Sequence, residues 1–345
     1  MANADVLLDI KGLKTYFFLE EGTVKAVDGV DLTIRRQKTM CVVGESGCGK
    51  SVTARSILQI VDPPGRIVEG EILYYRLQGG NGTSQASEVI NLAALDPKGR
   101  EIREIRGKEI SMIFQEPMTS LSPIHTVGNQ IIEMIQLHLP LTKQEARDLA
   151  IQMLARVGIP KPEQRIDDYP FQLSGGMRQR AMIAMALSCR PNLIIADEPT
   201  TALDVTTQAQ ILDLMVELQE DMGMAIMLIT HDLGVVAEMA DEVAVMYLGH
   251  VVETGDVDSI FHDPKHPYTQ ALLRSIPKVG LKARERLDSI RGMVPDPYNR
   301  PTGCPFHTRC DEVIPGVCER TLPPRINLGE GRTVRCLLYA ENGGE

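Results

Sequence analysis

Eight residues in the N-terminal part have the types and spacing of a phosphate-binding loop. The segment Gly44–Ser51 reads GESGCGKS, fits the pattern G-x4-G-K-[ST], and follows the apolar run Thr39–Val43. Glycines let the backbone form a nest of inward-pointing N–H groups, and the next helix start adds partial positive charge. We expect Lys50 to reach the β- and γ-phosphates of a nucleotide and Ser51 to ligate Mg²⁺. A chance glycine-rich turn is the alternative, which the strand–loop–helix context disfavours.

A second apolar segment ends in two carboxylates. Leu193–Ala196 is followed directly by Asp197 and Glu198. Ligands of open parallel sheets bind at the carboxyl ends of the strands. There Asp197 would hold Mg²⁺ through water and Glu198 would polarise an attacking water, whereas a solvated acidic turn is the alternative.

A third segment, Leu173–Arg180, opens a predicted helix that runs to about Cys189. Ser174 is a good N-cap, and the two glycines after it leave backbone N–H groups uncovered. This segment is therefore a second anion-facing helix start, separate from the phosphate loop.

The elements around these motifs predict a parallel sheet with a helical insert. Strand-like and helical segments alternate between Leu193 and Thr230, as in βαβ units. Between 117 and 170 apolar residues recur at helical spacing, in particular over Val127–Leu137 and Lys143–Val157. The segments Val6–Ile10 and Leu13–Phe18 are typical of strands, and the polar stretch 78–87 predicts a surface loop.

Composition limits the classes of protein that fit. The 345 residues suggest two or three domains at roughly 100–200 residues each. No apolar run approaches the roughly 20 residues needed to span a bilayer. The N-terminus lacks a signal-peptide pattern, so we expect a cytoplasmic protein. A net charge of −10 disfavours general nucleic-acid binding.

Taken together and in this order, the motifs resemble those of the ATP-binding subunit of an ATP-binding cassette (ABC) transporter. Gly44–Ser51 resembles Walker A, Leu193–Glu198 Walker B, and Leu173–Gln179 the LSGGQ signature, with Met177 in place of the commonest Gln. The resemblance covers about 6–255. It implies an α/β P-loop NTPase with a RecA-like parallel sheet core, an N-terminal antiparallel β subdomain, a helical insert at about 117–175 and a small irregular C-terminal extension.

The resemblance also assigns roles to single residues. Gln115 resembles the Q-loop glutamine, Asp204 the D-loop aspartate, and His231 the switch histidine that touches the γ-phosphate. Phe17, or neighbouring Tyr16, would stack on adenine, the alternative being a core aromatic. Glu198, His231 and Gln115 are the implied catalytic residues, and Ser51, Gln115 and Asp197 the implied Mg²⁺ ligands. The implied ATP-binding residues are Phe17, Gly44, Ser46, Gly47, Cys48, Gly49, Lys50, Ser51, Val52 and Asp197; those facing the ATP of a partner are Ser174, Gly175, Gly176 and Met177.

The mechanism implied by the family needs two cassettes. They pair head to tail with ATP between them, so that binding closes the dimer and hydrolysis lets it open. The helical insert would pass this motion to separate membrane-embedded subunits. A nucleotide-binding module without turnover, and a non-transport ABC ATPase acting on nucleic acid or ribosomes, are the alternatives.

The C-terminal segment differs in composition from the rest. From Ala271 onward there are 12 basic and 9 acidic residues, in a chain whose net charge is −10. His266–Thr269 and Gly303–Cys310 resemble the extension of oligopeptide/dipeptide importers. We therefore predict a cassette at 1–260 and an extension at 261–345.

That branch implies a set of partners. They are a different second ATPase, two transmembrane permease subunits at the cytoplasmic face of the membrane and, indirectly, an external solute-binding protein. This chain resembles the first of the two ATPases. Di- or oligopeptides are the expected cargo, and oligosaccharides or metal complexes are the alternatives.

Four of the seven cysteines, Cys304, Cys310, Cys318 and Cys336, lie in this extension. Four thiolates are the usual donors of a [4Fe–4S] cluster, which some relatives carry. We expect such a cluster as a structural staple. Zinc and plain reduced cysteines are the alternatives, while disulfides are disfavoured in a reducing compartment. Cys48 is expected to be only a small residue in a tight loop.

Overall fold

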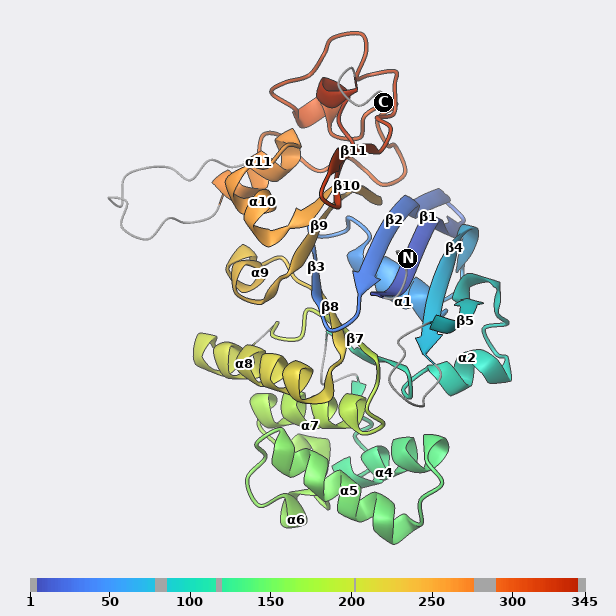
Figure 1. Ribbon diagram of the computed structural model, residues 1–345, viewed down its shortest axis with the longest axis vertical. Coiled ribbons are helices and arrows are strands. Elements are labelled where there is room, and N and C mark those ends of the chain that lie inside the picture. The colour runs from blue at the N-terminus through green and yellow to red at the C-terminus, as the bar shows by residue number, and fades with distance from the viewer. Residues whose placement is uncertain (1–4, 78–85, 116–119, 202, 276–289, 341–345) are drawn as a thin grey trace. The chain divides into compact units, whose positions relative to one another are not determined.

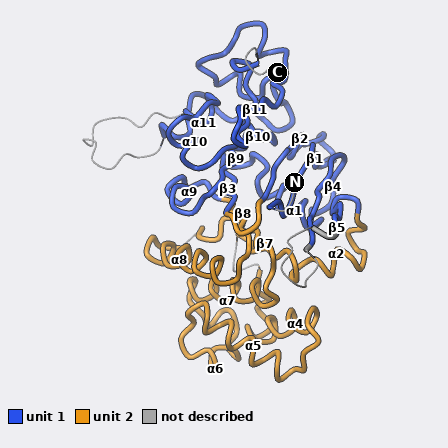
Figure 2. Tube along the Cα trace, in the orientation of Figure 1, with its two compact units in different colours: residues 1–34, 39–94, 230–345 blue, residues 35–38, 95–229 orange. Residues whose placement is uncertain are grey.

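The computed structural model describes residues 5–77, 86–115, 120–201, 203–275 and 290–340. Two compact units divide the chain, unit 1 with residues 1–34, 39–94 and 230–345, and unit 2 with residues 35–38 and 95–229 (Figure 2). Most of the predicted loop at 78–87 lies outside the described residues, and 86–87 belong to a strand. Among the described residues no helix is long and apolar enough to cross a membrane. The predicted boundary between 260 and 261 stays a prediction.

Unit 1 contains an antiparallel sheet in the strand order β2-β1-β4-β5. Its strands are β1 (Val6–Leu19), β2 (Gly22–Arg35), β4 (Gly65–Leu77) and β5 (Ala86–Asn91). The two strands predicted within 6–18 are one continuous strand, because the register with β4 shifts between Lys11 and Lys14 instead of breaking. Such a bulge interrupts the alternation of side chains, and the sequence therefore resembles two strands.

The second group of strands in unit 1 runs in the order β11-β12-β10-β9-β3. They are β3 (Thr39–Val43), β9 (Glu242–Tyr247), β10 (His250–Asp256), β11 (Ile326–Gly329) and β12 (Arg332–Val334). β3 pairs with β9 in parallel and is buried along its whole length, which explains its continuous apolar sequence. β10 pairs antiparallel with both β9 and β12.

The extension, predicted to be irregular and strand-poor, contains two short strands among its described residues. β11 and β12 join the extension to β10 (Figure 1). They are four and three residues long, too short for a hydrophobic period to be recognised. The helical elements of unit 1 are α1 (Lys50–Ile57), η1 (Leu92–Ala94), α9 (Leu233–Met239), α10 (Val257–His262), α11 (Pro267–Arg274), η3 (His307–Arg309) and η4 (Leu337–Tyr339).

Unit 2 contains three parallel strands and most of the longer helices. The strands β6 (Ile110–Ile113), β7 (Leu193–Asp197) and β8 (Ala225–Ile229) pair in the order β8-β7-β6. The helical elements are α2 (Arg100–Ile105), α4 (Val127–His138), α5 (Lys143–Arg156), α6 (Pro162–Arg165), η2 (Pro170–Gln172), α7 (Gly175–Leu187) and α8 (Val205–Met222). The predicted strands and helices of this unit are confirmed to within about two residues at each end.

Local signals define where these helices begin and end. Thr142 and Glu145 form a reciprocal capping box at the start of α5. Thr126 caps α4, and α8 ends at Gly223, whose φ of 64° is easiest for a glycine. Helices α4 and α5 of the predicted insert pack against each other and against α7, which begins at Gly175 (Figure 1). The insert thereby leads into the segment that begins at Ser174.

Candidate functional site

The loop between β3 and α1 folds around the ammonium group of Lys50. The Lys50 side chain is buried, and its Nζ donates to the carbonyl oxygens of Gly44 at 2.7 Å and Glu45 at 3.2 Å. Gly49 has a φ of 103° just before the helix begins. The chain therefore turns sharply into α1 and places Ser51 and Val52 in its first turn.

Backbone packing fixes two glycines of this loop. A Cβ on Gly44 would lie 2.2 Å from the carbonyl oxygen of Met246 in β9. A Cβ on Gly49 would lie 2.3 Å from the carbonyl oxygen of Ala26 in β2. Because neither backbone atom can move cheaply, both positions require glycine, as the motif predicts.

Cys48 is an inert part of this packing. Its side chain is buried, and its carbonyl accepts a hydrogen bond from the N–H of Gly249 at 2.8 Å. Burial raises the pKa of the Cys48 thiol, and the opposing effect of Lys50 is smaller. A thiol of this kind is protonated near neutral pH, in keeping with the expected small-residue role.

The carboxylate segment in unit 2 holds a strained residue. Asp197 ends β7 and is buried, and Glu198 follows with a φ of 47°. A left-handed conformation costs energy for a residue with a side chain and persists only where neighbours enforce it. The N–H of Glu198 donates to the carbonyl of Ile229 at 2.9 Å, which fixes this turn against β8.

The side chain of Glu198 is oriented by two hydrogen bonds. Gln115 Nε2 donates to Glu198 Oε2 at 3.1 Å, and Thr201 Oγ1 donates to the same oxygen at 3.0 Å. The structure therefore brings together Gln115 and Glu198, which are far apart in the sequence. Glu116 and Pro117, which follow Gln115, lie outside the described residues, as does Ala202.

The signature segment lies at the start of α7. Ser174 is exposed, and its hydroxyl accepts a hydrogen bond from the N–H of Met177 at 3.3 Å, as expected of an N-cap. Gly175 and Gly176 are half-buried, and a Cβ on Gly176 would lie 2.9 Å from the Thr207 methyl group.

Asp204, which was predicted to belong to a D-loop, caps the neighbouring helix. Its carboxylate accepts hydrogen bonds from Thr207 N at 3.0 Å and Thr207 Oγ1 at 2.7 Å. These bonds lower the pKa of Asp204. Asp204 is therefore the N-cap of α8, and its partner Thr207 lies next to Gly176.

The predicted residues are distributed over the two units. The phosphate loop, the aromatic pair and His231 belong to unit 1, whereas Gln115, Asp197, Glu198, the signature residues and Asp204 belong to unit 2. His231 is exposed and follows Thr230, whose N–H donates to the carbonyl of Val42 in β3 at 3.3 Å. The strand that leads into the phosphate loop thus also places His231.

The two candidate aromatic residues have different surroundings. The Tyr16 hydroxyl donates to Asp28 Oδ1 at 2.7 Å, and Lys25 Nζ lies 5.6 Å from the centre of the ring. Burial, with this hydrogen bond, raises the pKa of Tyr16. Phe17 is half-buried, and its ring lies against Gly65, where a Cβ would approach Cε1 to 2.6 Å.

Sequence reasoning missed two residues of the extension that contact the loop. Arg309 pairs with Glu45 at 2.6 Å, and the Tyr268 hydroxyl accepts a hydrogen bond from the Glu45 N–H at 2.9 Å. Both residues lie in segments that were singled out only for their likeness to an importer extension. The sequence contains no spacing that connects positions so far apart.

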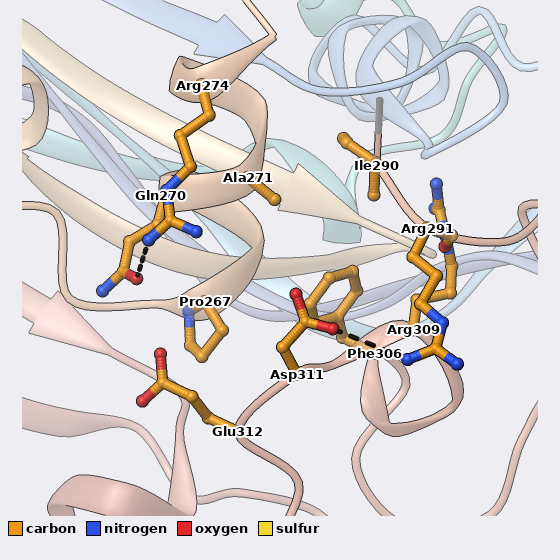
Figure 3. A pocket seen from close by; sticks show the side chains of 10 residues that line it. All are labelled: Pro267, Gln270, Ala271, Arg274, Ile290, Arg291, Phe306, Arg309, Asp311 and Glu312. Carbon is orange, nitrogen blue, oxygen red and sulfur yellow. Dashed lines mark hydrogen bonds and ion pairs between the residues drawn. The ribbon is translucent and has the colours of Figure 1, made fainter. Parts of the chain in front are cut away.

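Arg309 also lines a pocket of about 260 Å³ (Figure 3). Its lining combines Arg274 and Gln270 from α11 with Arg291, Asp311 and Glu312 from the loops of the extension. The side chain of Arg291 is 83% exposed and lies 3.9 Å from Asp311. Basic and acidic groups therefore share this pocket in similar numbers.

The geometry agrees with comparisons to known proteins. Residues 27–201 match the ABC transporter family, and residues 252–318 match the oligopeptide/dipeptide transporter C-terminal region. Over 340 residues the chain is 48% identical to the oligopeptide transport ATP-binding protein AppD of Bacillus subtilis, with 98% of each chain covered. The chain belongs to the ABC transporter family.

Two further matches support this assignment of the chain to the ABC transporter family. The dipeptide transport ATP-binding protein DppD of Escherichia coli is 46% identical over 338 residues, with 98% of each chain covered. The ATP-binding cassette MJ0796, solved as a dimer bound to ADP and Pi, shares 26% identity with a TM-score of 0.62. It covers 73% of this chain and 99% of its own. These matches confirm the predicted α/β P-loop fold and the predicted ATPase class. They also confirm that the chain resembles the ATP-binding subunits of peptide importers.

The prediction of an iron–sulfur cluster in the cassette's extension finds no support. Among the residues that the structure describes, no group of three or more His, Cys, Asp or Glu side chains is arranged to hold a metal ion. Cys304, Cys318 and Cys336 are buried as free thiols. Burial, with a smaller contribution from neighbouring cysteines, raises the pKa of Cys310 to about 11 and of Cys336 to about 12.

Proposed function

We propose that the chain hydrolyses ATP to drive the import of di- or oligopeptides. The observation that carries the ATPase part is the pair Gln115–Glu198, because a strained carboxylate with a fixed orientation suits a residue that activates water. The peptide cargo is supported by the extension and by the names of the relatives, which describe oligopeptide and dipeptide transport. Oligosaccharide or metal-complex import remains the alternative that an uptake assay must distinguish.

The residues of the nucleotide site divide into two groups. Lys50 and the N–H groups of Gly44–Ser51 would bind the β- and γ-phosphates, with Ser51, Asp197 and Gln115 as donors for Mg²⁺. Mg²⁺ bound there would neutralise phosphate charge. Glu198 would accept a proton from the attacking water, and His231 would contact the γ-phosphate.

Phe17 is the better candidate of the two aromatic residues for stacking on adenine. The hydroxyl of Tyr16 is bonded to Asp28, and a lysine lies over the ring of Tyr16. Phe17 has no polar group to satisfy, and an apolar ring stacks on any flat base.

We also propose that the active form is a head-to-tail dimer with a different second ATPase. Ser174, Gly175 and Gly176 would complete the ATP site of that partner, because they form a helix start that is partly exposed. Two transmembrane permease subunits would hold the pair at the cytoplasmic face of the membrane and receive the motion of the helical insert. An external solute-binding protein would deliver the peptide.

The test of this proposal is Glu198→Gln. Glutamine keeps the shape of the side chain but cannot accept the proton, so the hydrolysis rate should fall about 1,000-fold while ATP still binds. Release of phosphate by the reconstituted transporter measures the first effect, and equilibrium binding of ATP measures the second. Wild-type turnover by the variant would remove Glu198 from its proposed role.

The same variant tests the cargo. Cells that carry Glu198→Gln in place of the natural residue should lose uptake of labelled dipeptides and keep uptake of a labelled oligosaccharide. The reverse pattern would assign the importer to the other solute, and an Asp213→Asn variant, changed on the exposed side of α8, is the matched control.

A further inference from the structure

The C-terminal extension contacts Glu45 of the phosphate loop through the side chains of Arg309 and Tyr268. Arg309 Nη1 lies 2.6 Å from Glu45 Oε2, and Arg309 Nη2 lies 3.0 Å from Glu45 Oε1. Two parallel hydrogen bonds between a guanidinium and a carboxylate form the strong, directional version of an ion pair. The Tyr268 hydroxyl accepts a hydrogen bond from the N–H of the same residue at 2.9 Å.

Arg309 is itself held in place by the extension and by β9. It is 5% exposed, its Nε donates to the carbonyl of Arg291 at 2.9 Å, and its Nη1 also donates to the Tyr247 hydroxyl at 3.3 Å. The guanidinium lies 5.8 Å from the centre of the Tyr247 ring. The hydrogen bond to Glu45 is the main cause that raises the pKa of Arg309. An ion pair with one partner this buried differs from the surface pairs that contribute little.

The conformation of Glu45 matters because its backbone forms part of the loop. Its carbonyl accepts hydrogen bonds from Lys50 Nζ at 3.2 Å and from the N–H of Cys48 at 3.3 Å. The N–H, the carbonyl and the carboxylate of Glu45 therefore all have partners. If Arg309 were removed, an unpaired negative charge would remain in a loop that binds phosphates.

We propose that Arg309 is a positioning residue for nucleotide binding. It neutralises the Glu45 carboxylate and holds it to one side, while Tyr268 fixes the backbone of the same residue. Arg309 acts through Glu45 and does not touch the nucleotide. The extension is thus a structural part of the phosphate loop, an inference that rests on the nucleotide site proposed above.

The test measures binding of a non-hydrolysable ATP analogue to the full chain. Arg309→Met should raise the Kd about tenfold, because the charge on Glu45 is left unpaired. Arg291→Met is the matched control: it removes an equal charge from an exposed side chain beside the same pocket, so its Kd should stay at the wild-type value.

The decisive variant is the double change Glu45→Gln with Arg309→Met. It leaves no unpaired charge, so its Kd should return to within about twofold of wild type. A double variant as weak as Arg309→Met, or an Arg309→Met variant with wild-type affinity, would overturn the inference. If Arg309→Met does not fold, Arg309→Lys and Arg309→Gln replace it, with an affinity loss expected for glutamine only. A wild-type chain that binds no analogue would instead refute the nucleotide site itself.

Discussion

The phosphate loop and the signature segment each place glycines at the start of a helix, but the protein holds them in different ways. Around the loop, β2, β9 and the extension all supply contacts, from the carbonyls of Ala26 and Met246 to the hydroxyl of Tyr268. The signature begins at the exposed Ser174, whose hydrogen bond to Met177 is a local cap. The loop is therefore held by parts of its own chain that are distant in sequence, whereas the signature starts at an exposed residue with a local cap.

Gly175→Asp tests this difference with the largest expected effect. A Cβ at Gly175 has its nearest neighbour, Leu203 Cδ2, at 4.0 Å, so this position has room for a Cβ. A carboxylate at this helix start would repel the phosphates of a facing nucleotide. Turnover of the assembled pair should fall about 100-fold, while ATP affinity of the isolated chain stays unchanged.

Phosphate release and equilibrium binding measure these two quantities, and Gly175→Ala controls for the added Cβ. A Gly175→Asp chain that binds ATP more weakly by itself would show that the signature acts within its own chain. The contrast between the two regions would then be wrong.

Mild acid should lower the free energy of unfolding of the chain, because two buried histidines become protonated on unfolding. Burial lowers the pKa of His266 to about 3 and of His250 to about 4, below the ordinary 6.5. The unfolded chain therefore takes up protons first, and the free energy of unfolding falls as pH decreases from about 6.5 to about 4. At pH 5.5 each histidine should cost about 1.4 kcal/mol relative to pH 7.5.

Urea unfolding at the two pH values measures this loss. His266→Asn is the informative variant, because asparagine keeps an acceptor for the Tyr268 N–H at the start of α11 but does not titrate. Its loss between pH 7.5 and 5.5 should be about 1.4 kcal/mol smaller than that of the wild type. An unchanged pH dependence would mean that His266 is not neutral in the folded protein.

The smallest expected effect separates the two signature glycines. Gly175→Ala should stabilise the chain by about 0.5 kcal/mol, because alanine is the better helix former and space is free. Gly176→Ala places its methyl group 2.9 Å from that of Thr207, so crowding should outweigh this gain and destabilise the chain by about 1 kcal/mol. Thermal unfolding of both variants measures these changes. Equal shifts of the two unfolding temperatures would contradict the close packing at Gly176.

Prediction from sequence succeeded where a short segment carries its own signal. The structure has three such features as expected: the strand Thr39–Val43 with the loop after it, the N-cap Ser174 and the strand that ends at Asp197. Each of them depends mainly on residues that are close in the sequence. The family resemblance gave Gln115 and Glu198 their roles, but the contact between their side chains was not predicted. Nothing in the local sequence joins β6 to β7.

The features that the sequence did not predict depend on distant partners. The strands β11 and β12 form because β10 offers an edge for pairing. A segment of three or four residues is too short for its sequence to indicate such a strand. The cysteines Cys304, Cys310, Cys318 and Cys336 are close enough to influence one another's pKa values, but the described residues give no support to the cluster that their number suggested. Arg309 could not be connected to Glu45 because 264 positions separate them.

The pairing of β12 with β10 has a consequence for any shortened form of this protein. Glu253 and Thr254 of β10 lie opposite Val334 and Thr333, so the last strands of the extension shield the side of β10 that faces away from β9. A chain truncated before Ile326 would present that side as a bare row of N–H and C=O groups, a template for strands of other molecules. Aggregation, rather than a cleanly separated cassette, is therefore what such a truncation should yield.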